Sequence, residues 1–368
     1  MRIKNLKIAL VVEELTQLGG AERILDYFLE ALPNAPVYTI VWDKEKTLHR
    51  YDKFDIRPSF IQKLPFAVKH YKWYLALMPK AVESFDLKEF DVVLSITSAL
   101  VKGVKTNNNQ LHVCYCNTPT RWLWSDSESY LETAPIPTFA RPLMPALISY
   151  LKKWDLRASK RPNYFIANSE NVKKRIKKYY NRESDSIFVP VDCGSFKVSK
   201  NKGEYYLIVS RLEPYKKVEM VISAFRKLKL SLKIVGTGTK FNDFKKSVPK
   251  NIELVGRVDD EKLAKMYEGS IAIIFPQEED AGIVPLESMA SGRPVIAFNK
   301  GGAKETVIEG KTGVFFSKQT VEDLILAVRK FQKMKFNSRV IRTQAEKFDK
   351  ELFKSKVLEY INSRYKNK

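Results

Sequence analysis

The stretch SIAIIFPQEEDAGIVPLESMASGRPVIAFNKGGAKETV, residues 270–307, predicts a strand, a loop and a helix, repeated once. Its apolar, β-branched run at residues 271–275 is typical of a buried strand. Pro285 then stands where helices begin, and Gly292 stands where they end. A second buried run, residues 294–298, leads to a glycine pair and a further short helix. This order favours a parallel α/β sheet, whose ligands bind at the carboxyl ends of the strands.

Two carboxylates, Glu279 and Glu287, flank the predicted start of the first helix. The amides of Gly282, Ile283 and Val284 have no partner inside that helix and are available to bind a phosphate. A carboxylate is repelled by a phosphate, so it is better suited to hydroxyl groups. The pair therefore suggests a nucleotide-sugar, with one acid for the ribose diol and one for the sugar. The alternative is a solvated acidic loop in which Glu287 complements the helix dipole.

The segment from Glu279 to Glu287, with DAGIVPL between them, resembles the E-x7-E signature of family 4 retaining glycosyltransferases with the GT-B fold. The resemblance implies two Rossmann-like parallel-sheet domains that face each other across a cleft. It implies an acceptor-binding domain at residues 1–195 and a nucleotide-sugar-binding domain at residues 204–345. A C-terminal helix, at about 346–368, is expected to cross back to the first domain. Glu279 would then contact the transferred sugar and Glu287 the ribose.

Two cations lie in the predicted strand-to-helix loop SRLEPYK, residues 210–216. Negative charge builds up on a diphosphate leaving group, and Arg211 and Lys216 are suited to stabilise it. The alternative is that both are ordinary surface cations, in a chain with 64 lysines and arginines. The arrangement resembles the diphosphate clamp SRLxPxK of the family. The catalytic residues predicted on this basis are Glu279, Arg211 and Lys216.

Further donor contacts are implied at Gly256 and Val258, because the backbone of relatives touches the nucleotide base there. The turn GGAER, which starts at Gly19 and Gly20, resembles the family's turn between donor phosphate and acceptor. As a residue pattern alone, two glycines at a turn also allow close approach of a ligand to the backbone.

The segment CNTPTRWLW, residues 116–124, resembles the CHTPxRYLW motif of bacterial mannosyltransferases that build O-antigen and exopolysaccharide. Asn117 and Arg121 are therefore placed in the acceptor and phosphate loop. Asn117 stands where relatives carry a histidine. An asparagine can hydrogen-bond a sugar hydroxyl but cannot act as a charged acid or a base. This departure leaves the identity of the donor open.

Composition bounds the remaining possibilities. A chain of 368 residues is long enough for two domains, and 44% hydrophobic residues support real cores. Its 64 basic and 42 acidic residues give a net charge of +22, which favours anionic partners. Motifs for nucleic-acid binding are absent from the sequence, so no nucleic-acid partner is predicted. The three cysteines form neither a disulfide framework nor a zinc site, and two of them predict buried thiols on one strand.

No run of eighteen apolar residues and no signal-peptide pattern occur in the sequence, so we expect a cytoplasmic protein. The segment FIQKLPFAVKHYKWYLALMPKAVESF, residues 60–85, alternates basic with aromatic and aliphatic residues. Such a segment can lie in a bilayer interface with its lysines reaching outward, or it can be an amphipathic helix pair that packs on the sheet. With the family's lipid-linked acceptors, it suggests a peripheral protein on the inner face of the bacterial plasma membrane.

The sequence thus predicts a retaining glycosyltransferase that needs no cofactor beyond its nucleotide-sugar co-substrate. No D-x-D triplet occurs, and no metal is expected. By resemblance, the first choice is a mannosyltransferase that uses GDP-mannose and a lipid-linked saccharide acceptor in surface polysaccharide synthesis. Alternatives are a UDP- or dTDP-sugar transferase, and a non-catalytic basic protein that binds anionic lipid or nucleic acid. An NAD-linked enzyme is disfavoured, because Phe241 replaces the third glycine of the dinucleotide fingerprint.

Overall fold

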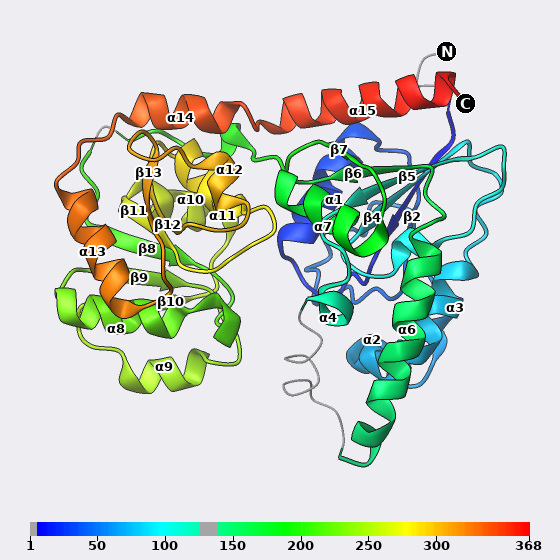
Figure 1. The fold of residues 1–368 in the computed structure, drawn as a ribbon, viewed down its shortest axis with the longest axis horizontal. Helices are drawn as coiled ribbons and strands as arrows, with labels where there is room; N and C mark the ends of the chain where they lie inside the picture. The colour runs from blue at the N-terminus through cyan, green and yellow to red at the C-terminus, as the bar shows by residue number, and fades with distance from the viewer. Residues whose placement is uncertain (1–5, 126–137, 200) are drawn as a thin grey trace. The chain divides into compact units, whose positions relative to one another are not determined.

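The computed structural model describes residues 6–125, 138–199 and 201–368, and it divides the chain into two compact units. Unit 1 comprises Met1–Phe188 and Lys354–Lys368, and unit 2 comprises Val189–Phe353. Each unit contains one parallel sheet with helices around it (Figure 1). The two units thus have the Rossmann-like architecture of GT-B proteins, as the sequence predicted.

Unit 1 has a seven-stranded sheet in the order β3-β2-β1-β4-β5-β6-β7. Its strands are β1 (Ile8–Val12), β2 (Val37–Thr39), β3 (Ile56–Pro58), β4 (Val92–Thr97), β5 (Leu111–Cys116), β6 (Tyr164–Ala167) and β7 (Asp185–Ser186). Its α-helices are α1 (Gly20–Ala31), α2 (Ala67–His70), α3 (Met78–Glu83), α4 (Arg121–Trp124), α6 (Met144–Ala158) and α7 (Glu170–Tyr180). The 3-10 turns are η2 (Phe60–Lys63), η3 (Tyr71–Leu77), η4 (Val101–Gly103) and η5 (Thr138–Leu143).

Unit 2 has a six-stranded sheet in the order β10-β9-β8-β11-β12-β13. Its strands are β8 (Tyr205–Val209), β9 (Leu232–Val235), β10 (Ile252–Gly256), β11 (Ser270–Phe275), β12 (Val295–Phe298) and β13 (Gly313–Phe316). Its α-helices are α8 (Val218–Leu228), α9 (Phe241–Ser247), α10 (Asp260–Glu268), α11 (Ile283–Ala290), α12 (Ala303–Thr306), α13 (Val321–Gln332) and α14 (Ser338–Glu346). The 3-10 turns are η6 (Cys193–Ser195) and η7 (Pro214–Lys216).

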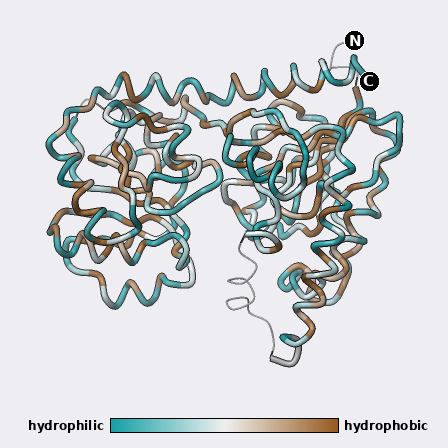
Figure 2. The backbone as a smooth tube through the Cα atoms, viewed as in Figure 1, coloured by the Kyte–Doolittle hydropathy of each residue, from teal (hydrophilic) through white to brown (hydrophobic). Residues whose placement is uncertain are grey.

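Both faces of each sheet are covered, which explains why the strands read as continuous apolar runs. In β8, Tyr206 and Ile208 join one hydrophobic cluster, whereas Tyr205 and Leu207 join another. Alternate residues of a strand point to opposite faces, so these clusters lie on the two sides of the sheet. Figure 2 shows the same pattern as apolar strands inside more polar helices.

The C-terminal part of the chain differs from one sequence-based prediction. The sequence pattern of residues 336–364 predicts one helix, but the structure has α14 and a separate helix, α15 (Lys350–Lys366). The break occurs because the backbone there pairs with Val191, which donates to Phe348 O (2.9 Å) and accepts from Lys350 N (3.0 Å). Helix α15 starts in unit 2, and its residues from Lys354 onward belong to unit 1 (Figure 1).

Smaller differences concern strand boundaries. The apolar residues at 186–191 predict a strand, but the structure has only the two-residue β7 there, and β3 was not predicted. Asn168 and Ser169 are residue types that favour a helix start. The structure confirms Ser169 in this role, because its hydroxyl accepts a hydrogen bond from Val172 N at 3.0 Å. Cys114 and Cys116 are both buried free thiols on β5, as expected. Among the described residues, none of the helices combines the length and the apolar composition needed to cross a bilayer.

Candidate functional site

The strand order of unit 2 reverses direction between β8 and β11, which are neighbours in the sheet but not in sequence. Parallel α/β sheets bind ligands at such a switch point, beyond the carboxyl ends of the strands. Lys216 follows β8, in η7, and Glu279 lies in the loop that follows β11. Their side chains form an ion pair, and they are only 12% and 22% exposed. The fold therefore joins two of the three predicted catalytic residues at the expected position.

Tyr215 connects Arg211 to this pair. The Arg211 guanidinium donates a hydrogen bond from Nη2 to the Tyr215 hydroxyl at 2.8 Å. The Lys216 ammonium lies 5.0 Å from the centre of the Tyr215 ring, within the range of a cation–π interaction. Arg211 itself is exposed to solvent. In the loop that follows β8, one cation therefore contacts the hydroxyl of Tyr215 and the other lies near its ring.

Glu287 is the fifth of the eight residues of α11 and is 3% exposed. Its Oε2 atom accepts a hydrogen bond of 2.6 Å from the hydroxyl of Tyr267, a residue of α10 that is fully buried. A hydrogen bond to a carboxylate is stronger than one between neutral groups, and it fixes the orientation of the carboxylate. Glu287 is thus a buried and positioned acid, and not a solvated one.

The helix start that precedes Glu287 has the backbone expected of an anion site. Gly282 is the N-cap of α11 and adopts φ +91°, a left-handed conformation that favours glycine. Ile283 and Val284 follow as the first helical residues, whose amides have no acceptor within the helix. Val284 and Val258 both pack against the hydrophobic cluster that contains Tyr267. The structure thus brings Val258 and the start of α11 to one cluster.

Two glycines hold the backbone of Glu279 in place. Gly302 N donates to Glu279 O at 2.9 Å. Gly301 has φ +65°, and a Cβ atom on it would lie 2.2 Å from Glu279 O, which is closer than real contacts allow. In the other half of the strand order, Gly236 N donates to Gly256 O at 2.8 Å, and this hydrogen bond joins the ends of β9 and β10. The loops at the carboxyl ends of the strands are therefore packed backbone to backbone.

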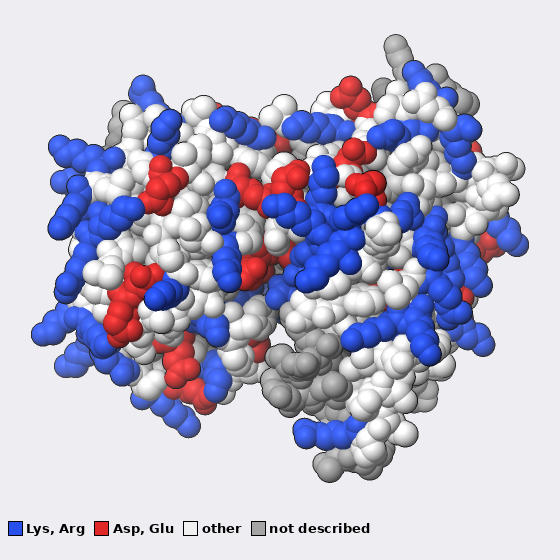
Figure 3. All heavy atoms as spheres, in the orientation of Figure 1, with Lys and Arg blue, Asp and Glu red and all other residues white. Residues whose placement is uncertain are grey.

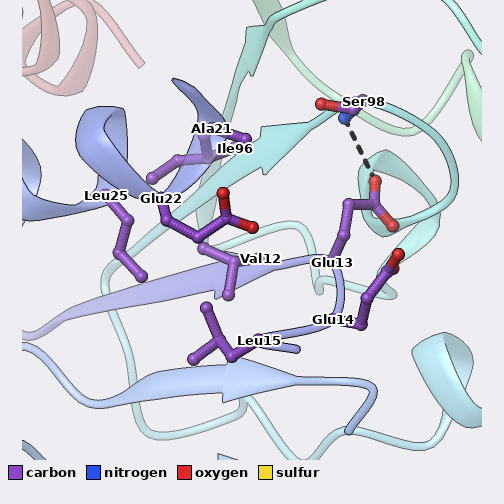
Figure 4. A pocket seen from close by; sticks show the side chains of 9 residues that line it. All are labelled: Val12, Glu13, Glu14, Leu15, Ala21, Glu22, Leu25, Ile96 and Ser98. Carbon is purple, nitrogen blue, oxygen red and sulfur yellow. Dashed lines mark hydrogen bonds between the residues drawn. The ribbon is translucent and has the colours of Figure 1, made fainter. Parts of the chain in front are cut away.

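Unit 1 has a second switch point, between β1 and β4. A small pocket opens there, at the carboxyl ends of the strands and the start of α1 (Figure 4). Its lining residues are Val12, Glu13, Glu14, Leu15, Ala21, Glu22, Leu25, Ile96 and Ser98. The pocket is exceptional in a chain of net charge +22, because its only charged residues are acids.

The three acids of this pocket differ in their partners. Oε1 of Glu13 accepts hydrogen bonds from the backbone amides of residues 98–101, between 2.8 and 3.3 Å, and from the Thr97 hydroxyl at 2.9 Å. Glu13 therefore holds the loop after β4 in place (Figure 4). Glu22 accepts from Gly19 N at 2.9 Å, so it fixes the predicted Gly19–Gly20 turn.

Glu14 is the acid with the perturbed ionisation. Burial is the main reason why the pKa of its carboxyl is raised to about 7, and the nearby charge of Glu13 contributes to the rise. The Tyr71 hydroxyl donates to its Oε1 at 2.8 Å and opposes the rise in pKa. A carboxyl with such a pKa changes protonation near neutral pH, which makes it a functional candidate.

Asn117 and Arg121 follow β5 in unit 1. Asn117 donates from Nδ2 to the hydroxyl of Ser98, a pocket residue, at 3.3 Å. Arg121 is the first residue of α4. The structure therefore places Asn117 beside the pocket that also involves Gly19. The loop after β5 and the glycine turn after β1 are thus each hydrogen-bonded to a residue that lines this pocket.

A buried ion pair lies beneath the Asn117–Arg121 loop. Lys102 and Asp155 are 1% and 0% exposed and form an ion pair. Burial alone would lower the pKa of Lys102, but the Asp155 carboxylate raises it above its ordinary value. Asp155 also accepts from the Thr120 hydroxyl (3.0 Å) and from Trp124 Nε1 (2.8 Å). The pair thus ties the loop after β4 to the loop after β5.

Sequence reasoning missed the groups that orient the site: Tyr215, Tyr267, Glu13, Glu14, Glu22, Lys102 and Asp155. One signal was available, because Glu13 and Glu14 directly follow an apolar strand, where ligand-binding residues gather. Tyr267 and Asp155 give no such signal, since they lie within helices far along the chain. Within the described parts of the chain, no group of three or more histidine, cysteine or acidic residues is arranged to hold a metal ion.

Known proteins resemble this chain in part of its sequence and in its fold. Residues 195–348 match the family model "Glycosyl transferases group 1". An uncharacterized glycosyltransferase of Methanocaldococcus jannaschii is 32% identical over 162 residues, which cover 42% of this chain and 43% of the relative. The alpha-1,3/1,6-mannosyltransferase of Candida glabrata is 26% identical over 83% of this chain and 78% of its own. The match to the Methanocaldococcus protein thus spans less than half of either chain.

Solved structures share the fold over nearly the whole chain. The Anabaena protein HepE in complex with UDP aligns with a TM-score of 0.69 at 16% identity, covering 97% of this chain and all of its own. A sucrose-phosphate synthase from Thermosynechococcus elongatus aligns with a TM-score of 0.73 at 14% identity, covering 98% of this chain and all of its own. Residues 195–348 are therefore similar to the group 1 glycosyl transferases, and the chain shares the fold of these solved structures.

Proposed function

We propose that this protein is a retaining glycosyltransferase that moves a sugar from a nucleotide-sugar to a saccharide acceptor. The single observation that carries the proposal is the Lys216–Glu279 pair at the switch point of unit 2, beside Tyr215 and Arg211. An acid and two cations at that position suit a ligand that has both hydroxyl groups and a diphosphate. The family match over residues 195–348 supports the same conclusion.

The chemistry assigned to these residues is electrostatic. Cleavage of the bond between sugar and diphosphate leaves negative charge on the phosphate, and Lys216 and Arg211 would stabilise it. The first amides of α11, at Ile283 and Val284, would add the positive end of a helix dipole. Glu279 would hold the transferred sugar and Glu287 the ribose diol. Fixed cations and backbone amides would then stabilise the negative charge of the diphosphate, as a metal ion does in other enzymes.

The acceptor would bind at unit 1, near Gly19, Gly20, Asn117 and Arg121. The acidic pocket supports an acceptor that presents hydroxyl groups, since carboxylates accept hydrogen bonds from sugars. We propose a lipid-linked saccharide, used at the inner face of the plasma membrane for surface polysaccharide synthesis. The excess of basic side chains on the surface supports attraction to an anionic membrane (Figure 3).

Two donors deserve a direct comparison. GDP-mannose is the first choice, supported by the mannosyltransferases among the relatives and by the motif at residues 116–124. A UDP-sugar is the second, supported by the Anabaena structures, which contain UDP, UDP with glucose, and UDP-glucose.

The test is a thermal-shift screen with GDP, UDP, dTDP and NAD, followed by transfer assays with the matching nucleotide-sugars and lipid-linked acceptors. We expect one nucleoside diphosphate to stabilise the protein and its sugar to be transferred with retained anomeric configuration. Indifference to every nucleotide, with tight binding of oligonucleotides, would favour the non-catalytic alternative. A product of inverted configuration would contradict the mechanism but not the donor site.

A further inference from the structure

The segment from η2 through α3 exposes apolar side chains that are not part of the hydrophobic core. Its inner residues, such as Ile61, Leu75 and Met78, are buried in the main hydrophobic cluster of unit 1. Its outer side nevertheless carries large hydrophobic side chains that are exposed by 37 to 73%, namely Phe60, Phe66, Trp73 and Leu77. They are four of the fourteen large hydrophobic residues that are exposed in the described structure, and they fall within eighteen positions. Single exposed hydrophobics are ordinary, but such a concentration marks an interaction surface.

The backbone and ring contacts keep two of these aromatics outward. Phe66 is the most exposed of them, at 73%, and it adopts φ +56°, a left-handed conformation that is rare for a bulky residue. Backbone strain of this kind persists where the surrounding structure enforces it, often at functional positions. Trp73 is 63% exposed, and its ring stacks at 4.4 Å on His70, which is itself exposed. Neither ring therefore completes the core.

The charges along this segment are mainly positive. Its four lysines are Lys63, Lys69, Lys72 and Lys80. The one acidic residue between η2 and the end of α3, Glu83, forms ion pairs with Lys105 and Arg161. All four lysines are exposed. Lysine side chains can lay their apolar stems on a hydrocarbon surface while the ammonium groups reach outward. Figure 2 shows the alternation of brown and teal along α2 and α3.

From these observations we infer that η2, α2, η3 and α3 form a docking surface for an anionic lipid bilayer. Phe66 and Trp73 would enter the interfacial layer, where aromatic rings are favoured, and the four lysines would contact acidic headgroups. A protein partner would have to supply a surface both apolar and acidic, whereas an anionic bilayer has both properties throughout. The inference deepens the proposed function and rests on it for the acceptor, but lipid binding is measurable without any sugar transfer.

The test is co-sedimentation of the full chain with vesicles of phosphatidylcholine alone and with one-third phosphatidylglycerol. We expect binding to the anionic vesicles only. The double variant Phe66→Ser/Trp73→Ser should lose about tenfold or more in partition coefficient, because two aromatic side chains no longer enter the interface. Lys69→Glu/Lys72→Glu should lose about fivefold or more for each lysine, and the loss should shrink in high salt.

A matched control is available in unit 2. Leu326 and Val340 are 62% and 48% exposed, and Leu326→Ser/Val340→Ser removes two exposed apolar side chains while leaving the proposed docking surface unchanged. Brominated lipids should quench tryptophan fluorescence of the wild type more than that of Trp73→Phe, because the remaining tryptophans are less exposed.

Three outcomes would overturn the inference. They are no binding to anionic vesicles at low salt, equal losses in the control and the Phe66/Trp73 variant, and equal quenching in wild type and Trp73→Phe. Self-association of the free protein that Phe66→Ser/Trp73→Ser abolishes, seen by light scattering, would assign the surface to a second copy of the chain instead. If vesicle binding is confirmed but no nucleotide-sugar is used, the proposed function fails while the docking surface stands.

Discussion

The two switch points have the same topology but opposite electrostatics. In unit 2, the loop after β8 supplies the cations Arg211 and Lys216, and Lys216 is paired with Glu279. In unit 1, the charged residues of the pocket at β1 and β4 are all acids. Topology alone therefore decides where a ligand binds, and the loop residues decide what kind of ligand it is. A diphosphate suits the first site, and a neutral polyhydroxyl compound suits the second.

The largest expected effect comes from removing the cation that defines the unit 2 site. Lys216→Met should lower the transfer rate by roughly 10²–10³-fold, because charge on the leaving diphosphate loses its buried partner. Glu279→Ala should likewise abolish transfer without unfolding the chain. The measurement is kcat with the nucleotide-sugar identified by the thermal-shift screen.

Lys250→Met is the matched control for this prediction, since Lys250 is an exposed lysine of the same unit, outside the switch point. It should retain full activity. Normal turnover by Lys216→Met or Glu279→Ala would remove the functional distinction between the two switch points.

The second effect concerns the buried acid of unit 2. Glu287→Gln should raise KM for the donor roughly ten- to a hundredfold, the range expected for losing a hydrogen bond to a charged group. Tyr267→Phe removes only the hydrogen bond that orients Glu287, so its KM should rise less. A fall in kcat with unchanged KM in Glu287→Gln would instead show that Glu287 acts in the chemical step.

The third prediction separates the steric effect of an added Cβ atom from the effect of a left-handed backbone conformation. Gly301 and Gly310 both have positive φ, at +65° and +76°. A Cβ at Gly301 would meet Glu279 O at 2.2 Å, whereas at Gly310 the first neighbour is a methionine methyl at 3.8 Å. Gly310→Ala should destabilise the fold by about 1 kcal/mol, and Gly301→Ala by about 2 kcal/mol or more, with weaker donor binding as well. Urea unfolding and nucleotide titration measure these quantities, and equal behaviour of both variants would contradict the packing argument.

The last prediction concerns a pH dependence of stability that arises in unit 1. The Glu14 pKa is about 7 in the folded state and 4.5 in its ordinary state. The folded state therefore binds the proton more tightly, and its stability falls as pH rises from about 4.5 through 7. Glu14→Gln stays neutral and keeps an oxygen for Tyr71, so the stability difference between variant and wild type should widen over this window.

Asp26, whose pKa burial raises to about 6, contributes a slope of the same sign between 3.8 and 6. It is present in both proteins, so the difference isolates Glu14. A pH-independent difference in unfolding free energy would show that Glu14 is already charged in the folded protein.

The sequence allowed the prediction of features that depend on local pattern. The strands of residues 270–307 and the approximate start of α11 follow from apolar runs and from Pro285. The Lys216–Glu279 pairing was not predictable from spacing, because 63 residues separate them and only the sheet order brings them together. The break between α14 and α15 was also missed, because it depends on pairing with Val191, which no local signal reveals.

The buried Lys102–Asp155 pair has a consequence for how this chain can change over evolutionary time. Loss of either partner alone would leave an unpaired charge in the interior, at a cost of about 3–5 kcal/mol, which is a large part of a typical domain's stability. Replacement of both by apolar residues could be nearly neutral for folding. Descendants of this chain should therefore keep both residues or lose them together, and single losses should be rare. Paired substitution at 102 and 155 would thus mark lineages in which the loops after β4 and β5 have been free to take new shapes.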